Sequence, residues 1–495
     1  MVKFIRVLPV FLFVSILSYT PTIKASPDYQ EPKADKTVAE TTKEATPKKQ
    51  KKKKNTDEES VRVILLPQII QSTSAVPVTT NTQGSASSTT TVKQGATAAK
   101  TPGIKLFPTV APLVTATAGQ LVISEFRLRG LSGANDEFIE IFNNSGADHT
   151  VTAASGTGYG IAASDGITRC SIPNGTVIPN RGHYLCVNSV AYSLASYPAG
   201  NGTTATGDAT YTLDIPDNAG IALFNNNTGG GSYSLASRLD AVGSTTEANT
   251  VYKEGTGYPA LVPFSINSAF YRDNCGKNGS ITTMGACPSA GNLIDTNNNA
   301  TDFVFVDTNG TSAGAGQRLG APGPENLSSP IERNASFTAP LLDTCVGGSS
   351  PPNRVRDFTS DPANNSTFGT LDIRRTIVNN TGGNVTRLRF RVVDITTFPA
   401  PSGIADLRPR TAGTVVVTVD RPPCGSGMSN VSVNGTTLEQ PASQPNGGGF
   451  NSSMSAGTVT LATPVANGAS VDVRFLLGIQ QTGLFKFYIN IEALP

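Results

Sequence analysis

The segment from Asp295 to Asp302 carries the residue types that bind a hard cation. Carboxylate and amide oxygens at alternate positions are ligands that Ca²⁺ prefers, and Asp295, Asn297 and Asn299 have this spacing, with Asp302 behind them. The pattern departs from an EF-hand loop, because the sixth position is Ala300 and no Glu occupies the twelfth. We therefore favour an Asn-rich turn that enters a strand, with calcium binding as the alternative.

A second candidate site is the arginine series Arg387, Arg389 and Arg391. These residues alternate with apolar ones, so a strand would place all three guanidinium groups on one face. Such a row could bind phosphate, sulfate or carboxylate groups of a glycan or a nucleic acid. We favour the simpler interpretation, in which the row lies on an exposed sheet face and pairs with cross-strand acids such as Asp372 and Asp472.

Residues for catalysis are sparse. The two histidines, His149 and His183, are too few for a His-rich metal site, and neither stands near a GxSxG motif. Glu137 and Glu140 lie three residues apart on an expected strand, so they point to opposite faces and do not converge for general acid–base chemistry. We expect no enzyme and no cofactor. A secreted nuclease or phosphoesterase without a recognisable motif is the alternative.

The cysteines indicate an oxidising compartment. The chain has six, an even number that is typical of disulfide bonding in exported proteins. Fifteen connectivities are open to six cysteines, and we expect neighbours along the chain to pair. The alternative, a metal bound by the reduced second pair, lacks a CxxC motif and a nearby His. The expected pairs are Cys170 with Cys186, Cys275 with Cys287, and Cys345 with Cys424.

Several segments have the sequence patterns of β-strands and turns, and their order along the chain is informative. LVISEFRLRGLSGANDEFIEIFNNS at 121–145 has two β-rich runs around a Gly- and Asn-containing turn. It is followed by GIALFN at 220–225, RLDAVGS at 238–244, DTNNNATDFVF at 295–305 and LGAPGPEN at 319–326. In this order the segments resemble the lamin tail domain, an immunoglobulin-like β-sandwich of nuclear lamins and of many secreted bacterial proteins.

The resemblance covers roughly residues 119–326 and implies a tethering or adhesion module, as is thought for bacterial members. The region 147–211 departs from it, because it is longer and richer in Gly and Thr than a compact tail domain requires. Further runs such as GTVVVTVD and LFKFYINIEAL indicate a second immunoglobulin-like sandwich, of no recognised family.

The expected fold is all-β, with two immunoglobulin-like β-sandwich domains in tandem after a signal peptide and a disordered stalk. Residues 1–25 have the charged start and apolar run of a cleaved signal peptide, with an uncleaved anchor as the alternative. Residues 26–118 are Lys-, Thr-, Ser- and Pro-rich and read as a disordered linker. The expected first sandwich spans 119–326, a linker 327–352, and the second sandwich 353–495.

Charge and export together limit the partners. With 38 Lys and Arg against 36 Asp and Glu, the net charge is +2, which gives no overall signature for nucleic acid. Nucleic acid is therefore the less favoured partner. Lys48 to Lys54 could bind an anionic polymer, but we favour a solvated run bordered by the acids Asp57, Glu58 and Glu59. We expect a secreted or cell-envelope protein of a bacterium, without a transmembrane anchor in the mature chain. Its partner would be an unknown macromolecule of the cell surface or matrix, either glycan or protein.

Overall fold

The structure is a computed structural model that describes residues 62–63, 114–197, 204–262, 266–272, 293–308, 319–394, 405–439, 451–457, 459 and 463–494. The predicted signal peptide, nearly all of the predicted linker 26–118 and the predicted Cys275–Cys287 pair lie outside these residues. Regular structure in the described part is almost entirely β-strand, which confirms the all-β prediction. The helices are short, namely α1 (Asn299–Asp302), η1 (Gly230–Ser232), η2 (Thr250–Tyr252), η4 (Asn334–Ser336) and η5 (Pro362–Asn364).

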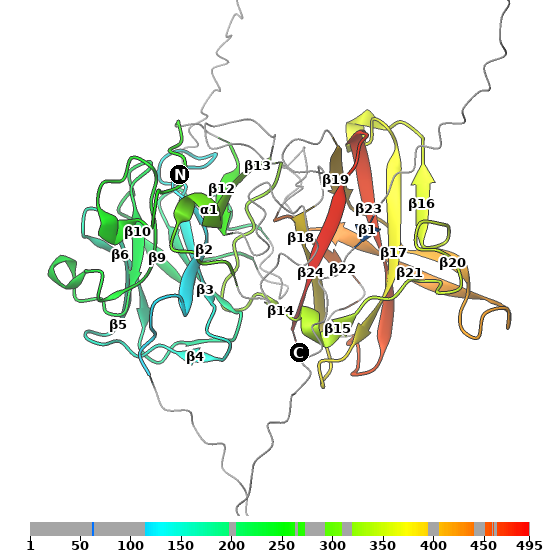
Figure 1. Ribbon diagram of the computed structural model, residues 1–495, viewed down its shortest axis with the longest axis horizontal. Helices are drawn as coiled ribbons and strands as arrows, with labels where there is room; N and C mark the ends of the chain where they lie inside the picture. The colour runs from blue at the N-terminus through cyan, green and yellow to red at the C-terminus, as the bar shows by residue number, and fades with distance from the viewer. Residues whose placement is uncertain are drawn as a thin grey trace, which may run out of the picture. The chain divides into compact units, whose positions relative to one another are not determined.

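The strands between residues 114 and 308 form three sheets (Figure 1). The first sheet, in the order β13-β12-β2-β3-β8-β9, contains β2 (Leu121–Arg127), β3 (Phe138–Asn143), β8 (His183–Asn188), β9 (Ala209–Tyr211), β12 (Ser268–Arg272) and β13 (Phe303–Asp307). The second, in the order β11-β10-β5-β6, contains β5 (Gly158–Ala163), β6 (Thr168–Pro173), β10 (Ile221–Phe224) and β11 (Arg238–Val242). The third pairs β4 (His149–Thr150) with β7 (Val177–Ile178).

A β-bulge in β2 decides which of its side chains enter the core. The register between β2 and β3 shifts between Ile123 and Glu125, so one extra residue is accommodated in β2. Leu121, Ile123 and Phe126 therefore all join one apolar core, together with residues of the second sheet. The same shift directs Glu125 to the opposite face, where it lies cross-strand from Glu140 of β3.

The first two sheets pack face to face and are joined by a disulfide. Cys170 lies in β6 and Cys186 in β8, and their Cα atoms are 6.3 Å apart. Both cysteines are buried in the same core as Phe126 and Phe270, whose stacked rings lie 5.0 Å apart. This part of the chain is therefore β-sandwich-like, with a covalent link between its layers.

The remaining strands form one large sheet, in the order β1-β24-β18-β22-β21-β23-β17-β15 (Figure 1). Four further strands branch from this order, because β14 pairs with β24, β16 with β17, β19 with β23 and β20 with β21. Its strands are β1 (Arg62–Val63), β14 (Ile331–Glu332), β15 (Phe337–Thr338), β16 (Arg354–Asp357), β17 (Thr370–Asn379), β18 (Arg387–Asp394), β19 (Asp406–Arg410), β20 (Val415–Asp420), β21 (Met428–Leu438), β22 (Ser453–Ala456), β23 (Ser470–Gln481) and β24 (Lys486–Leu494).

This sheet encloses a second apolar core. The ring of Phe475 in β23 lies 5.0 Å from that of Phe390 in β18 and 5.7 Å from that of Phe487 in β24. Leu388, Phe390 and Val392 are buried there, as their alternation along the sequence predicts. Residues 327–352, which the sequence predicts as a linker, contribute β14 to β24 and β15 to β17. The described residues after Glu58 form one compact unit with two cores, and their division into two domains stays a prediction.

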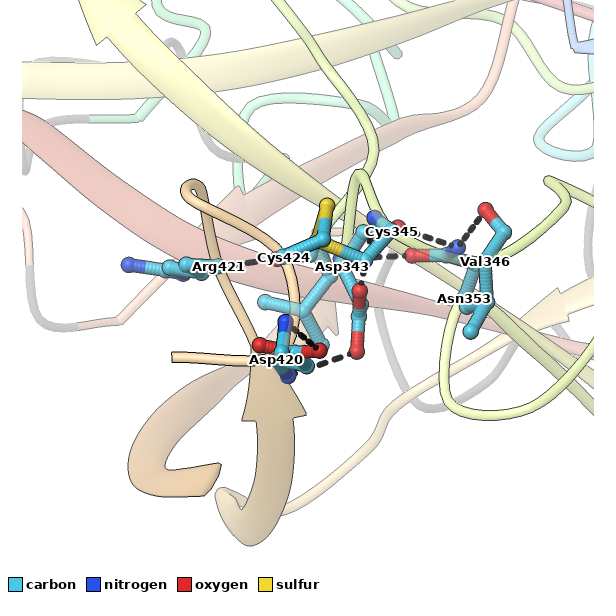
Figure 2. The surroundings of a disulfide bond; sticks show 9 residues. Asp343, Cys345, Val346, Asn353, Asp420, Arg421 and Cys424 are labelled. Atoms are coloured by element: carbon cyan, nitrogen blue, oxygen red, sulfur yellow. Dashed lines mark hydrogen bonds between the residues drawn. A yellow bond between two sulfur atoms is a disulfide. The ribbon is translucent and has the colours of Figure 1, made fainter. Parts of the chain in front are cut away.

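A second disulfide fixes the segment around Asp343 to the end of β20 (Figure 2). Cys345 and Cys424 are bonded with their Cα atoms 5.6 Å apart. The buried Asp343 carboxylate accepts hydrogen bonds from the backbone N–H of Cys345 (2.9 Å) and of Asp420 (2.8 Å). The Asn353 amide donates to the Asp343 carbonyl at 2.7 Å, so the link is both covalent and hydrogen-bonded.

We predict that each disulfide stabilises the fold according to the chain length that it closes. The sequence separations are 16 residues for Cys170–Cys186 and 79 for Cys345–Cys424. Loop-closure entropy then gives about 3 and about 4.5 kcal/mol. Paired Cys→Ala variants should lower the free energy of unfolding by these amounts in urea titrations. Unchanged unfolding midpoints in both variants would contradict this, and the intact mass with and without reductant checks that the cystines form.

Candidate functional site

Charged side chains gather in the interior where the face of β2, β3 and β8 that points away from their core meets β18 and β24. We call this group the ionic cluster, and its members are Glu125, Glu140, His183, Glu325, Arg389, Arg391, Glu439 and Glu492.

The arginines of β18 are the positive charges of the ionic cluster. Arg389 pairs with Glu325 (Nη1–Oε1 2.8 Å) and with Glu439 (Nε–Oε2 2.8 Å). Arg391 pairs with Glu325 (Nη2–Oε2 3.0 Å) and with Glu492 (Nε–Oε1 3.2 Å). Glu325 thus bridges both guanidinium groups, one through each oxygen.

The expectation of an exposed arginine row is wrong for two of its three members. The side chains of Arg389 and Arg391 are only 2% and 3% exposed, whereas that of Arg387 is 22% exposed and pairs with Glu439. Alternation along a strand distinguishes its two faces but does not reveal what covers them. Here the carbonyls of Gly323 and Asn451 both accept from Arg391, so the polar face of the strand is covered as well.

The acids expected to pair with this row have other partners. Asp372 Oδ2 lies 2.8 Å from Arg374 and 2.9 Å from Arg474. Asp472 Oδ2 lies 2.7 Å from Arg421. Anion binding by the arginine row therefore has to compete with the protein's own glutamates.

Glu125 and Glu140 are cross-strand neighbours of like charge in a buried place. The Glu125 carboxylate accepts from the Gly323 N–H at 2.9 Å and from the Asn451 amide at 2.8 Å. Glu140 accepts from the Glu325 N–H at 2.6 Å. Burial raises the pKa of Glu125 to about 7 against the opposing effect of Arg391. Burial, reinforced by the neighbouring carboxylates, raises the pKa of Glu140 well above its usual range.

His183, like Glu140, is a member of the ionic cluster that the sequence patterns led us to set aside as a catalytic residue. Its Nε2 lies 3.4 Å from Glu325 Oε2 and 3.7 Å from Glu140 Oε1. Burial lowers the pKa of His183 to about 3, so the imidazole is neutral at physiological pH. The only sequence signal is long-range, because His183 comes to this face through its pairing with Phe142 across β3 and β8.

Glu140, His183 and Glu325 offer ligand atoms within 4.8 Å of one another, which is compatible with a metal ion. Each carboxylate already has donors from the protein, because Glu140 accepts from Ser124 and Glu325 pairs with both arginines. A metal would have to displace these contacts. The arrangement fits a structural role, in which Arg389 and Arg391 hold carboxylates from distant parts of the chain together.

The structure shows separate contacts for the residues of the alternative calcium-binding interpretation, Asp295, Asn297, Asn299 and Asp302. Asn299 uses its side chain internally, since it accepts from the N–H groups of Gly243 and Glu254 at 2.9 Å each. Asp302 accepts from the Thr296 N–H at 3.0 Å. Asn297 has φ +56°, and its N–H donates to Asp295 Oδ1 at 3.3 Å, so it supplies the turn. The four residues therefore do not converge as one ligand set.

The buried arginine Arg272 does bring Asp295 and Asp302 near further acids. Arg272 Nη2 lies 2.6 Å from Asp240 Oδ2, and Nη1 lies 3.6 Å from Asp295 and 3.7 Å from Asp302. We call Asp240, Glu254, Asp295 and Asp302 the acidic cluster. Sequence spacing could not identify it, because Asp240 and Glu254 stand far from the Asn-rich loop.

An apolar hollow opens near the end of β2. It encloses about 420 Å³, open solvent included, and its lining includes Phe126, Leu128, Tyr258 and Phe270. Val262 stands in its lining with 70% of the residue exposed.

Two polar contacts hold the edge of this hollow in place. The Arg129 guanidinium pairs with the Asp217 carboxylate at 2.8 Å. Asn218 donates to the Leu261 carbonyl at 2.8 Å and accepts from the Leu261 N–H at 2.7 Å. The hollow is therefore preformed, with a charged pair beside an apolar floor.

No protein-family model matches the chain, and no curated protein matches its sequence. The resemblance to the lamin tail domain accordingly stays a prediction. Among the described residues, no helix has the length and apolar character needed to cross a membrane.

We predict that Arg391→Met destabilises the protein by about 3 to 5 kcal/mol, because it leaves buried carboxylates without their cation. Arg387→Met is the matched control, since Arg387 lies on the same strand face but is partly exposed. It should cost about 1 kcal/mol or less. The free energies of unfolding of both variants can be measured by urea titration. Equal losses of unfolding free energy in the two variants would contradict the larger contribution that we assign to the buried arginine of the ionic cluster.

Proposed function

We propose that this chain is a non-catalytic secreted or cell-surface protein that binds or tethers another macromolecule through its β-sandwich-like modules. The observation that carries the proposal is the preformed apolar hollow beside the Arg129–Asp217 pair. A concave, mainly apolar site with a few fixed polar groups is the usual form of a binding site.

The chemistry of the hollow favours a protein as the partner. Its floor consists of buried aromatic and aliphatic side chains, among them Phe126, Tyr258 and Phe270. Such a floor suits one apolar side chain of the partner, and the charged pair at its edge can fix the orientation of polar neighbours. We therefore propose that the partner is a protein of the cell envelope or extracellular matrix that presents an apolar side chain.

The two disulfides support the compartment. Cys170–Cys186 and Cys345–Cys424 are formed, and structural disulfides are typical of proteins outside the cytoplasm. Export through a cleaved signal peptide, as the first 25 residues suggest, would deliver the chain there.

The test is a pull-down of the full-length protein against cell envelopes, free glycans and DNA, with Val262→Asp as the binding variant. A charge at this exposed position of the hollow should weaken binding to the envelope protein by about tenfold or more, because the loss of one buried apolar contact is worth at least about 1.4 kcal/mol. Val416→Asp is the matched control, since Val416 is 72% exposed, lies in β20 outside the hollow and should not affect binding.

Three results would contradict the proposal. Equal binding by both variants would remove the hollow from the binding site. Salt-sensitive retention on DNA would favour the nucleic-acid interpretation instead. Turnover of nuclease, phosphatase or glycosidase substrates by the purified protein would show that it is an enzyme.

A further inference from the structure

The acidic cluster around Arg272 holds more negative charge than the protein neutralises. Its members come from β11, from the segments that follow η2 and precede α1, and from α1 itself. The side chains of Asp240 and Asp302 are 0% exposed, that of Glu254 4%, and that of Asp295 15%. Only Asp295 has appreciable access to solvent.

Two guanidinium groups face these four carboxylates. Arg272 pairs with Asp240 at 2.6 Å and stands 3.6 to 3.7 Å from Asp295 and Asp302. Arg238 Nη2 pairs with Glu254 Oε1 at 3.1 Å. The ionised groups thus leave an excess of two negative charges, and uncompensated charge in a buried site is costly.

Two carboxylate oxygens in this place accept no hydrogen bond from any group in the described part of the chain. They are Asp240 Oδ1 and Glu254 Oε2, the oxygens not engaged by Arg272 and Arg238. Ligand oxygens of Asp240, Glu254 and Asp295 lie within 4.8 Å of one another. A buried carboxylate pair in this arrangement requires either a proton or a cation.

We propose that Asp240, Glu254 and Asp295 bind a divalent cation, and that this cation is Ca²⁺. Three carboxylate ligands without Cys or His match a hard, oxygen-preferring ion, and the irregular spacing suits the flexible coordination of Ca²⁺ better than the strict octahedron of Mg²⁺. One divalent ion neutralises the excess charge. The site shares only Asp295 with the ligand set that the Asn-rich loop suggests.

Protonation is the competing way to satisfy the same oxygens. Burial raises the pKa of Asp240 to about 6, and burial together with Asp240 and Asp295 raises the pKa of Glu254 to about 9. Saturable binding of Ca²⁺ separates a cation site from a carboxyl pair that only shares a proton.

The site also has a structural consequence. Asp240 accepts from the Ile123 N–H at 2.6 Å, and Arg272 Nε donates to the Ile123 carbonyl at 2.7 Å. A cation on Asp240 would thus be connected to β2 at the position of its bulge. Loops that carry Glu254 and Asp295 would be held against β11 by the same ion.

The experiment is calorimetric titration of the full-length, chelator-treated protein with CaCl₂ at pH 7.5, together with thermal unfolding. We expect saturable binding with Kd in the range of about 10⁻⁴ to 10⁻³ M and a higher Tm. Glu254→Gln and Asp295→Asn should each weaken binding at least tenfold. Asp361→Asn is the control, because Asp361 is an exposed acid paired with Arg410 outside the cluster and its loss should leave the affinity unchanged.

The variants remain informative even if one is unstable. Glu254→Gln keeps the size of the side chain and a carbonyl oxygen that can accept from Arg238, and circular dichroism verifies its fold. Absence of saturable Ca²⁺ binding up to 10 mM, on the order of ten times the expected Kd, would overturn the proposal. So would wild-type affinity in both variants, or tighter binding of Zn²⁺ than of Ca²⁺.

Discussion

Buried charges must find opposite charges or protons, and this constraint governs the junction between the two halves of the described chain. Glu125 and Glu140 face each other across β2 and β3 with no access to bulk water. Arg391 of β18, far along the chain, lowers the pKa of Glu125 against the effect of burial, and Arg389 and Arg391 both pair with Glu325 beside these two acids. Removal of either the glutamates or the arginines alone would lower the stability of the fold, because a buried charge without its partner is strongly destabilising. The two cores are therefore coupled by electrostatics as well as by chain connectivity.

The segment 319–326 makes this coupling geometrically feasible. Its backbone donates to both glutamates, from Gly323 N–H to Glu125 and from Glu325 N–H to Glu140. The Glu325 side chain turns the other way and bridges Arg389 and Arg391. This short segment thus supplies backbone N–H donors to the two glutamates and a carboxylate acceptor to the two arginines. The segment that follows adds β14 to β24, so residues expected to form a linker help to close the structure.

Local patterns predicted what local geometry determines. Alternation predicted the apolar face of β18, and pairing of neighbours along the chain predicted Cys170–Cys186 and Cys345–Cys424, whereas a bulge interrupts the alternation of β2. The alternation of residues could not predict that the polar face of β18 is also buried, since the residues that cover this face come from segments far away in the sequence. The same limit applies to His183, which joins its carboxylates by strand pairing, and to Asp240 and Glu254, which meet Asp295 only after folding. The spacing of Asp295, Asn297 and Asn299 was informative about a turn, because Asp295 accepts from the Asn297 N–H and Asn297 has a positive φ, whereas Asn299 binds the distant backbone of Gly243 and Glu254.

The central claim is that the ionic cluster makes the strands on its two sides open as one cooperative unit. Native-state hydrogen exchange of the full-length protein, followed by mass spectrometry at increasing denaturant, measures this directly. If the claim is correct, amides of β2 and β3 and amides of β18 and β24 exchange with one shared opening free energy. If β18 and β24 lose protection at denaturant concentrations where β2 and β3 remain protected, the two cores unfold independently and the claim is wrong.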